Sequence, residues 1–170
     1  MFRITKKLAT ALKIKLPASP AGASAPAHEW FADLFHVQGK KCVIWVHRAT
    51  LLTFVRPAVT AAELREFHAL FRYEFRTAIA SLALPESLLD ALDVYEPESY
   101  AATNDRAVVG SMLDYRSMFA FMVEDLEDGL ASADVPALNA QLCETPMSVL
   151  RMDSALERVR LLLVSPDRHH

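Results

Sequence analysis

The chain has 170 residues, of which 52% are hydrophobic and 23% charged, and its formal net charge is −3 at pH 7. A chain of this length fits one domain, which can build a core without a metal or a disulfide. The composition excludes an intrinsically disordered chain, and no apolar run approaches the roughly 18 residues that a membrane helix needs.

The first 28 residues contain no acid and five basic side chains, which are Arg3, Lys6, Lys7, Lys13 and Lys15. This composition is typical of an organellar transit peptide. A short strand over residues 2–4, followed by a basic helix over residues 5–16, fits the same residues and is the interpretation that we favour. Pro, Ala, Ser and Gly dominate the next stretch, so we expect a flexible loop over residues 17–28.

Residues 30–56 are rich in aromatic and β-branched side chains, and we expect strands over residues 30–37, 42–47 and 51–56. The middle segment is apolar at odd and even positions alike. That pattern is typical of a strand buried on both faces, so we place it centrally in the sheet. With a two-residue turn at Gly39-Lys40, His36 would lie about 13 Å from His47 along one strand face, too far apart to share a metal ion.

Helices dominate the rest of the chain. Thr60 and Glu63 form a capping-box pattern at the start of a helix over residues 60–82, and Pro85 suits the first turn of a shorter helix. A second long helix is expected over residues 105–126, and acids crowd its C-terminal end, where the helix dipole disfavours them. The other expected segments, in order, are a short helix over 85–94, a loop over 96–103, the second long helix over 105–126, short helices over 135–142 and 154–163 (with 159–164 also compatible with a strand) and a disordered tail over 165–170.

These elements predict a single α+β domain over residues 1–170. Its core would be a small antiparallel sheet of three or four strands, packed against two main amphipathic helices plus shorter helices. The two cysteines, Cys42 and Cys143, lie in unrelated segments, and nothing else in the chain suggests export. We therefore expect free, buried thiols and a cytoplasmic protein.

The chain carries none of the usual metal or phosphate motifs. No H-E-x-x-H, paired C-x-x-C or Asp-rich loop occurs, and the four glycines form no phosphate-binding frame. We accordingly expect no metal and no cofactor. Asn104, Arg106 and Ser111 would place polar groups at the start of a buried helix, where anions are favoured. In the alternative interpretation, Asn104 or Asp105 only caps this helix, and Gly110 lets another element approach closely.

Charge is unevenly distributed along the chain. Residues 1–85 hold 12 Lys/Arg and 5 Asp/Glu, a balance of +7, whereas residues 86–134 hold 2 and 12, a balance of −10. One interpretation is that the two halves pack together, so that the N-terminal lysines pair with acids from residues 86–134. The other is a basic face that attracts an anionic partner.

Several short motifs follow one another along nearly the whole chain. They are Arg3-Ile4-Thr5-Lys6-Lys7-Leu8-Ala9, Trp30-Phe31-Ala32-Asp33, the set Leu51, Thr53 and Val55, Asn104-Asp105-Arg106, Gly110-Ser111-Met112-Leu113-Asp114 and Glu144-Thr145-Pro146-Met147. In this order they resemble the bacterial proteins grouped as domain of unknown function 6933. The resemblance implies a bacterial source and a basic N-terminus that belongs to the folded domain, but no activity or cofactor. Leu113 departs from the family pattern, in which Asn commonly follows the Met.

Three functions are compatible with this sequence. We favour a non-enzymatic binding or regulatory module that acts through a protein partner, because the aromatic-rich core carries no polar constellation. The first alternative is nucleic-acid or polyanion binding through the basic N-terminal helix, and the second is an enzyme with a site around residues 104–114. The sequence leaves the partner and the oligomeric state open. The candidate binding residues are Lys6, Lys7, Arg48, Asn104, Arg106, Ser111 and Asp114.

Overall fold

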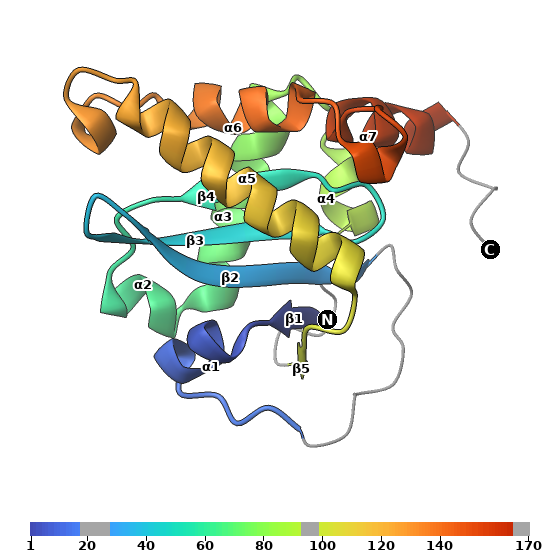
Figure 1. Ribbon diagram of the computed structural model, residues 1–170. Helices are drawn as coiled ribbons and strands as arrows, with labels where there is room; N and C mark the ends of the chain where they lie inside the picture. The colour runs from blue at the N-terminus through green and yellow to red at the C-terminus, as the bar shows by residue number, and fades with distance from the viewer. Residues whose placement is uncertain (18–27, 93–98, 165–170) are drawn as a thin grey trace.

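A computed structural model describes residues 1–17, 28–92 and 99–164 of the chain (Figure 1). Five strands form one sheet, with the order β4-β3-β2-β1-β5 across it. The α+β class is therefore confirmed. In chain order the strands are β1 (Phe2–Ile4), β2 (Trp30–Val37), β3 (Lys40–His47), β4 (Thr53–Arg56) and β5 (Tyr100–Ala102).

The sheet is mixed, which corrects the predicted antiparallel sheet of three or four strands. β2, β3 and β4 pair in antiparallel fashion, but β1 lies between β2 and β5 and runs parallel to both. β5 falls within residues 96–103, for which the sequence predicts a loop. β1 and β5 have three residues each, too few to carry an alternation pattern, and they form because distant segments supply their hydrogen bonds.

The β2–β3 hairpin turns at Gln38 and Gly39, one residue earlier than predicted. Both residues have positive φ, 48° and 74°, as a type I′ hairpin turn requires. His36 consequently faces Lys41 and not Val43, so the predicted register is wrong. The apolar pattern of β3 is confirmed, because the strand is buried on both faces over residues 42–47.

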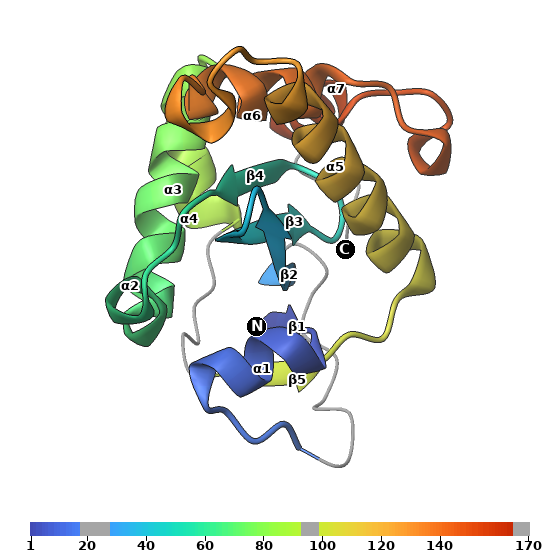
Figure 2. The same ribbon diagram turned by 60° about the vertical axis from the view of Figure 1, so that its left-hand side comes forward.

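Helices cover both faces of the sheet and its β4 edge (Figure 2). One face carries α2 (Ala61–Arg65), α3 (Phe67–Ser81) and α4 (Ser87–Leu92), and α5 (Arg106–Glu124) crosses the other. At the β4 edge lie α6 (Val135–Glu144) and α7 (Ala155–Val164), and α1 (Lys6–Leu12) follows β1. Two 3-10 helices complete the described elements, η2 (Gly129–Ala131) and η3 (Ser148–Leu150).

The helix expected over residues 60–82 is interrupted. Glu66 has a φ of −104° and a ψ of 41°, which separates α2 from α3. The predicted capping box of Thr60 and Glu63 is present at the start of α2. Residues 159–164 belong to α7 and are helical. The loop expected over 17–28 and the tail expected over 165–170 lie outside the described residues, apart from Pro17 and His28.

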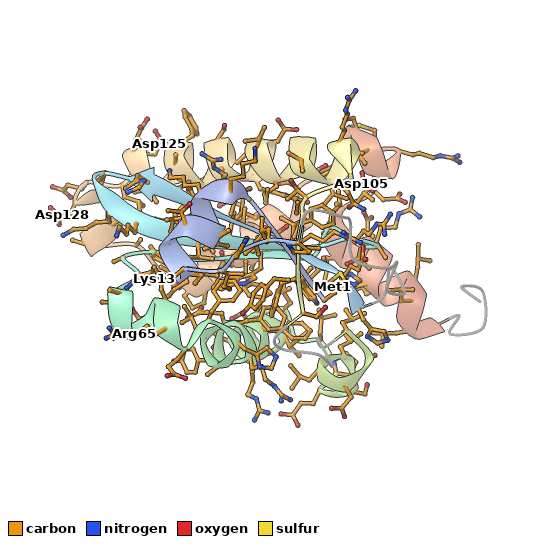
Figure 3. All side chains as sticks on the ribbon, turned by 90° about the horizontal axis from the view of Figure 1, so that it is seen from below. Met1, Lys13, Arg65, Asp105, Asp125 and Asp128 are labelled. Carbon is orange, nitrogen blue, oxygen red and sulfur yellow. The ribbon has the colours of Figure 1, made fainter. Side chains whose placement is uncertain are left out.

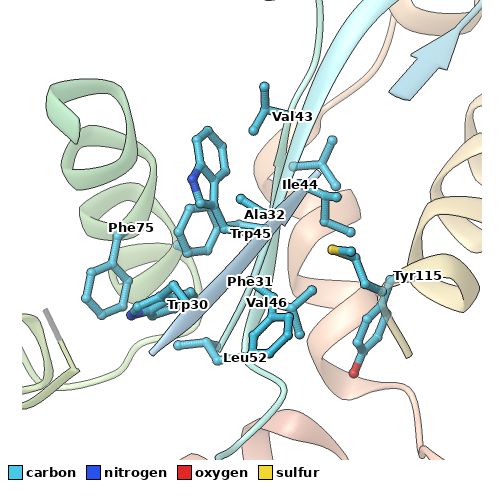
Figure 4. Packing of buried hydrophobic residues seen from close by; sticks show 14 of the residues in the cluster. Trp30, Phe31, Ala32, Val43, Ile44, Trp45, Val46, Leu52, Phe75 and Tyr115 are labelled. Atoms are coloured by element: carbon cyan, nitrogen blue, oxygen red, sulfur yellow. The ribbon is translucent and has the colours of Figure 1, made fainter. Parts of the chain in front are cut away.

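The core has two halves, one on each face of the sheet (Figure 4). Toward α5 lie Phe31, Ile44 and Tyr115. Toward α3 the core is a cluster of aromatic rings, made of Phe2, Trp30, Trp45, Phe54, Phe67, Phe71 and Phe75.

Cys42 and Cys143 are buried free thiols, as predicted. No helix within the described ranges is both long and apolar enough to cross a membrane.

Candidate functional site on helix α5

A chain of four charged side chains joins β1 to the start of α5. The Arg3 guanidinium donates from Nε and Nη2 to the two Glu29 carboxylate oxygens, at 3.0 and 2.7 Å. Arg48 Nη1 donates to Glu29 Oε2 at 2.7 Å, and Arg48 Nε lies 3.5 Å from Asp105 Oδ2. Asp105 in turn caps α5 by accepting from the backbone N–H groups of residues 107 and 108. We call these four residues the ionic network.

The centre of the ionic network is buried. Arg3 is 2% exposed and Glu29 fully buried, whereas Arg48 and Asp105 are partly exposed. Burial by itself raises the pKa of Glu29, but hydrogen bonds and charge from Arg3 and Arg48 outweigh it, so the pKa lies below its ordinary value. A buried carboxylate that stays ionised between two arginines holds β1, β2 and the end of β3 at fixed positions beside α5.

A second polar contact holds the middle of α5. Arg116 Nη1 donates to Asp33 Oδ2 at 2.6 Å, and the Thr5 hydroxyl donates to the other Asp33 oxygen. The Arg116 guanidinium also lies over the ring of Phe35, 5.1 Å from its centroid. Helix α5 is therefore tied to the sheet at two points, near its first turn and near its centre.

The residues predicted around 104–114 do not converge on one site. Ser111 is buried, and its hydroxyl donates to the backbone oxygen of Ala107 at 3.1 Å. Asn104, Arg106 and Asp114 are exposed. Of the two residues expected as possible caps, Asn104 and Asp105, it is Asp105 that caps α5. Side chains that would assemble an enzyme site are thus either occupied by the helix backbone or directed to solvent.

The remaining candidates occupy other positions. Arg48 belongs to the ionic network, where its contact with Asp105 joins the basic half of the chain to the acidic half. Lys6 and Lys7 are exposed on the first turn of α1, with Lys7 Nζ 3.4 Å from His36 Nδ1. Within the described residues, no lysine lies within 4.0 Å of a carboxylate, so the expected pairing of N-terminal lysines with acids from 86–134 is wrong there.

Neither a pocket nor a cluster of metal ligands marks a second candidate site among the described residues. A shallow depression on the α3–α4 side is lined by Arg72, Phe75, Arg76 and Leu89, away from the residues singled out in the sequence. In the part of the chain that the structure describes, no three His, Cys, Asp or Glu side chains gather as metal ligands would. The surface of α5 is the more informative feature.

Along α5, one line of residues faces solvent. It recurs at steps of three and four, which is one face of an α-helix. Leu113 and Phe121 on this line are 48% and 65% exposed, and a Cβ at Gly110 would meet no atom within 4 Å apart from the backbone of its own helix. We call this line the outer stripe. Its members are Arg106, Gly110, Leu113, Ser117, Phe121 and Glu124.

Sequence reasoning missed most of the charged contacts that position α5. Arg3 stands between Phe2 and Ile4 in a strand that is buried throughout, and a charge in such a place is the only local signal of an internal ion pair. Its partner Glu29 lies 26 residues away, and Asp33 lies 83 residues from Arg116. A single sequence does not indicate contacts between residues that are so far apart along the chain.

The fold and the site together define an α+β protein in which a long helix is anchored on a mixed five-stranded sheet and presents two large apolar side chains, Leu113 and Phe121, to solvent. The family model described as Domain of unknown function (DUF6933) matches residues 1–156 of the chain. This match covers all five strands and helices α1 to α6. The chain therefore belongs to this family, which confirms the resemblance of the short motifs. No curated protein matches the sequence.

Proposed function

We propose that this protein is a non-enzymatic binding module that acts through a protein partner, which docks on the outer stripe of α5. The observation that carries the proposal is the exposure of Phe121 and Leu113, 65% and 48%, on one face of a single helix. Isolated apolar side chains on a surface are ordinary, but these two lie on the same face of one helix, about two turns apart. Aromatic residues are enriched in protein–protein interfaces, and Phe121 fits that composition.

The anchoring of α5 supports the same function. Asp105 is held by Arg48 at the start of the helix, and Arg116 is held by Asp33 near its centre. A surface that is rigid before binding loses little conformational entropy when a partner docks. The two polar contacts therefore pre-organise the outer stripe.

Affinity capture from cells of the native host tests the proposal. We expect Phe121→Glu to lower the amount of the main captured protein at least tenfold, because a charge in place of the largest apolar side chain of the contact is costly to desolvate. The matched control is Tyr73→Glu, since Tyr73 is also 65% exposed but lies on α3. Equal capture by the wild type and by Phe121→Glu would contradict the proposal, provided that both variants melt like the wild type.

Polyanion binding is a second candidate function. It is favoured by the exposed lysines of α1 and of the β2–β3 hairpin, which lie in no ion pair among the described residues. Lys13 and Arg65 lie at the same end of the molecule (Figure 3). Asp125 and Asp128 lie at that end as well, and their charge opposes an anionic ligand.

A further inference from the structure

We infer that the partner of the outer stripe is a second copy of this chain, whose α5 packs antiparallel to that of the first. The inference rests on the proposed function of the stripe and names its partner. The outer stripe is complementary to itself, a property that a surface for an unrelated partner does not need. A two-fold axis requires this, because the same patch then forms both sides of the interface.

The charges at the two ends of the stripe are opposite. Arg106 and Glu124 are exposed, lie on the same face of α5 and are about 27 Å apart at 1.5 Å per residue. Their midpoint is residue 115. A two-fold axis perpendicular to the helix at that level pairs residues whose numbers sum to 230. Arg106 then faces Glu124 of the second copy, and this ion pair occurs twice.

The same register matches shape as well as charge. Leu113 faces Ser117 of the second copy, since 113 and 117 also sum to 230. Phe121 lies opposite Gly110, within one residue of the same register. Gly110 has open space where a Cβ would stand, so the ring of Phe121 has room there. A large side chain thus meets a small one at each of these positions, which lets two helices approach to about 8–10 Å.

Two features of α5 that are unfavourable in one copy become favourable in the pair. Glycine is the poorest helix-interior residue after proline, and no neighbouring atom requires it at position 110. A basic N-terminal residue and an acidic C-terminal residue both oppose the helix dipole. Neither Arg106 nor Glu124 has an ion-pair partner among the described residues. In the antiparallel pair each of them faces an opposite charge, and Gly110 leaves room for the Phe121 ring of the second copy.

Parallel pairing does not achieve this. It would place Arg106 against Arg106, Glu124 against Glu124 and Phe121 against Phe121 of the second copy. Like charges would then repel at both ends. The charge pattern therefore selects the antiparallel arrangement. One pair of helices buries less than the roughly 1,200 Å² of a standard interface, so we expect a reversible dimer with micromolar affinity.

Sedimentation velocity at chain concentrations from about 1 to 500 µM tests the inference. The wild type should shift from monomer to dimer across this range. Arg106→Glu and Glu124→Arg should each weaken the dimer at least tenfold, because each creates two like-charge contacts. The double variant Arg106→Glu with Glu124→Arg should restore the affinity to within about threefold of the wild type. Arg76→Glu on α3 is the control and should leave dimerisation unchanged.

Three results would overturn the inference. One is a wild type that stays monomeric at every concentration, and another is a dimer that neither single reversal weakens. The third is a double variant that fails to recover. Circular dichroism melts confirm that each variant is folded, which is expected because both positions are exposed. A monomeric wild type would leave the docking proposal to the host-cell capture experiment, so the two ideas can fail separately.

Discussion

At the scale of single residues, Glu29 is the centre of the buried ionic network. Its carboxylate is fully buried and accepts hydrogen bonds from Arg3 and Arg48. We expect Glu29→Gln to lower the free energy of unfolding at pH 7 by about 3–5 kcal/mol, because Arg3 would keep a buried charge without its counter-ion. Urea denaturation measures this change, and an unaltered midpoint would show that the ionic network contributes little.

The same residue predicts a pH dependence. The pKa of Glu29 in the folded protein is lowered below the ordinary value of 4.5, through Arg3 and Arg48 acting against burial. The stabilisation is therefore complete above about pH 4.5 and is lost as the pH falls through the folded-state pKa. The stability of Glu29→Gln should vary less than that of the wild type over this acidic range.

Glu74 provides the matched control, because its pKa is shifted in the opposite direction. Burial raises its pKa above the ordinary value, with Arg56 partly offsetting the effect and Glu63 adding to it. A raised pKa means that the group stabilises the fold at low pH and that this stabilisation is lost as the pH rises. Glu74→Gln should accordingly gain stability relative to the wild type between acidic and neutral pH, whereas Glu29→Gln should lose it.

At the scale of elements, α6 closes the β4 edge of the sheet. The Asn139 amide accepts from the Val55 N–H at 2.9 Å and donates to the Val55 oxygen at 3.1 Å. The Cys143 thiol donates to the Thr53 oxygen at 3.0 Å, and burial raises its pKa to about 12, so it remains protonated. Side chains of a helix thus occupy edge groups that would otherwise be open to another strand.

Removing this amide tests the role of α6. Asn139→Ala leaves two buried backbone groups without partners, and we expect it to cost about 2–4 kcal/mol in unfolding free energy. Gln141→Ala is the control on the same helix, since Gln141 is exposed. Thermal melts with light scattering also report any gain in aggregation. Equal stability of the two variants would mean that the β4 edge does not need α6.

Helix α1 carries the test of polyanion binding. If its lysines contact phosphates, Lys6→Ala with Lys7→Ala should lower the affinity and flatten the salt dependence by up to about 2 units. We expect no tight binding of heparin or DNA at physiological salt, because Asp125 and Asp128 lie at the same end of the molecule and their charge opposes an anion. Arg151→Ala with Arg160→Ala is the control. Sub-micromolar binding that only the lysine double variant abolishes would place polyanion binding first.

At the scale of the whole molecule, the sheet separates two half-cores. Phe71 and Phe119 are fully buried on opposite faces, as the apolar stripes of α3 and α5 predict. We expect Phe71→Ala and Phe119→Ala each to cost about 3–5 kcal/mol, the usual penalty for a large cavity. Differential scanning calorimetry measures both. A melt of either variant that matches the wild type would show that its half-core does not support the domain.

The long elements of the fold could be predicted from the sequence, because α5, β2 and β3 carry their apolar pattern over many residues. The parallel pairing of β1 with β2 and β5 could not, since three-residue strands depend on partners far along the chain. In the site, Arg48 and Arg106 could be proposed as basic side chains, but the contacts of Arg48 with Glu29 and Asp105 could not. The exposure of Phe121 was not assigned, although it falls off the inward stripe that ends with Val123.

The most direct test of the account is photo-cross-linking at the centre of the outer stripe. A benzophenone amino acid in place of Ser117 should give a cross-linked species in host cells, and one of twice 18.9 kDa if the partner is a second copy. The same amino acid in place of Tyr73 should give none. Equal cross-linking at both positions, or none at position 117, would contradict the claim that α5 is the docking surface.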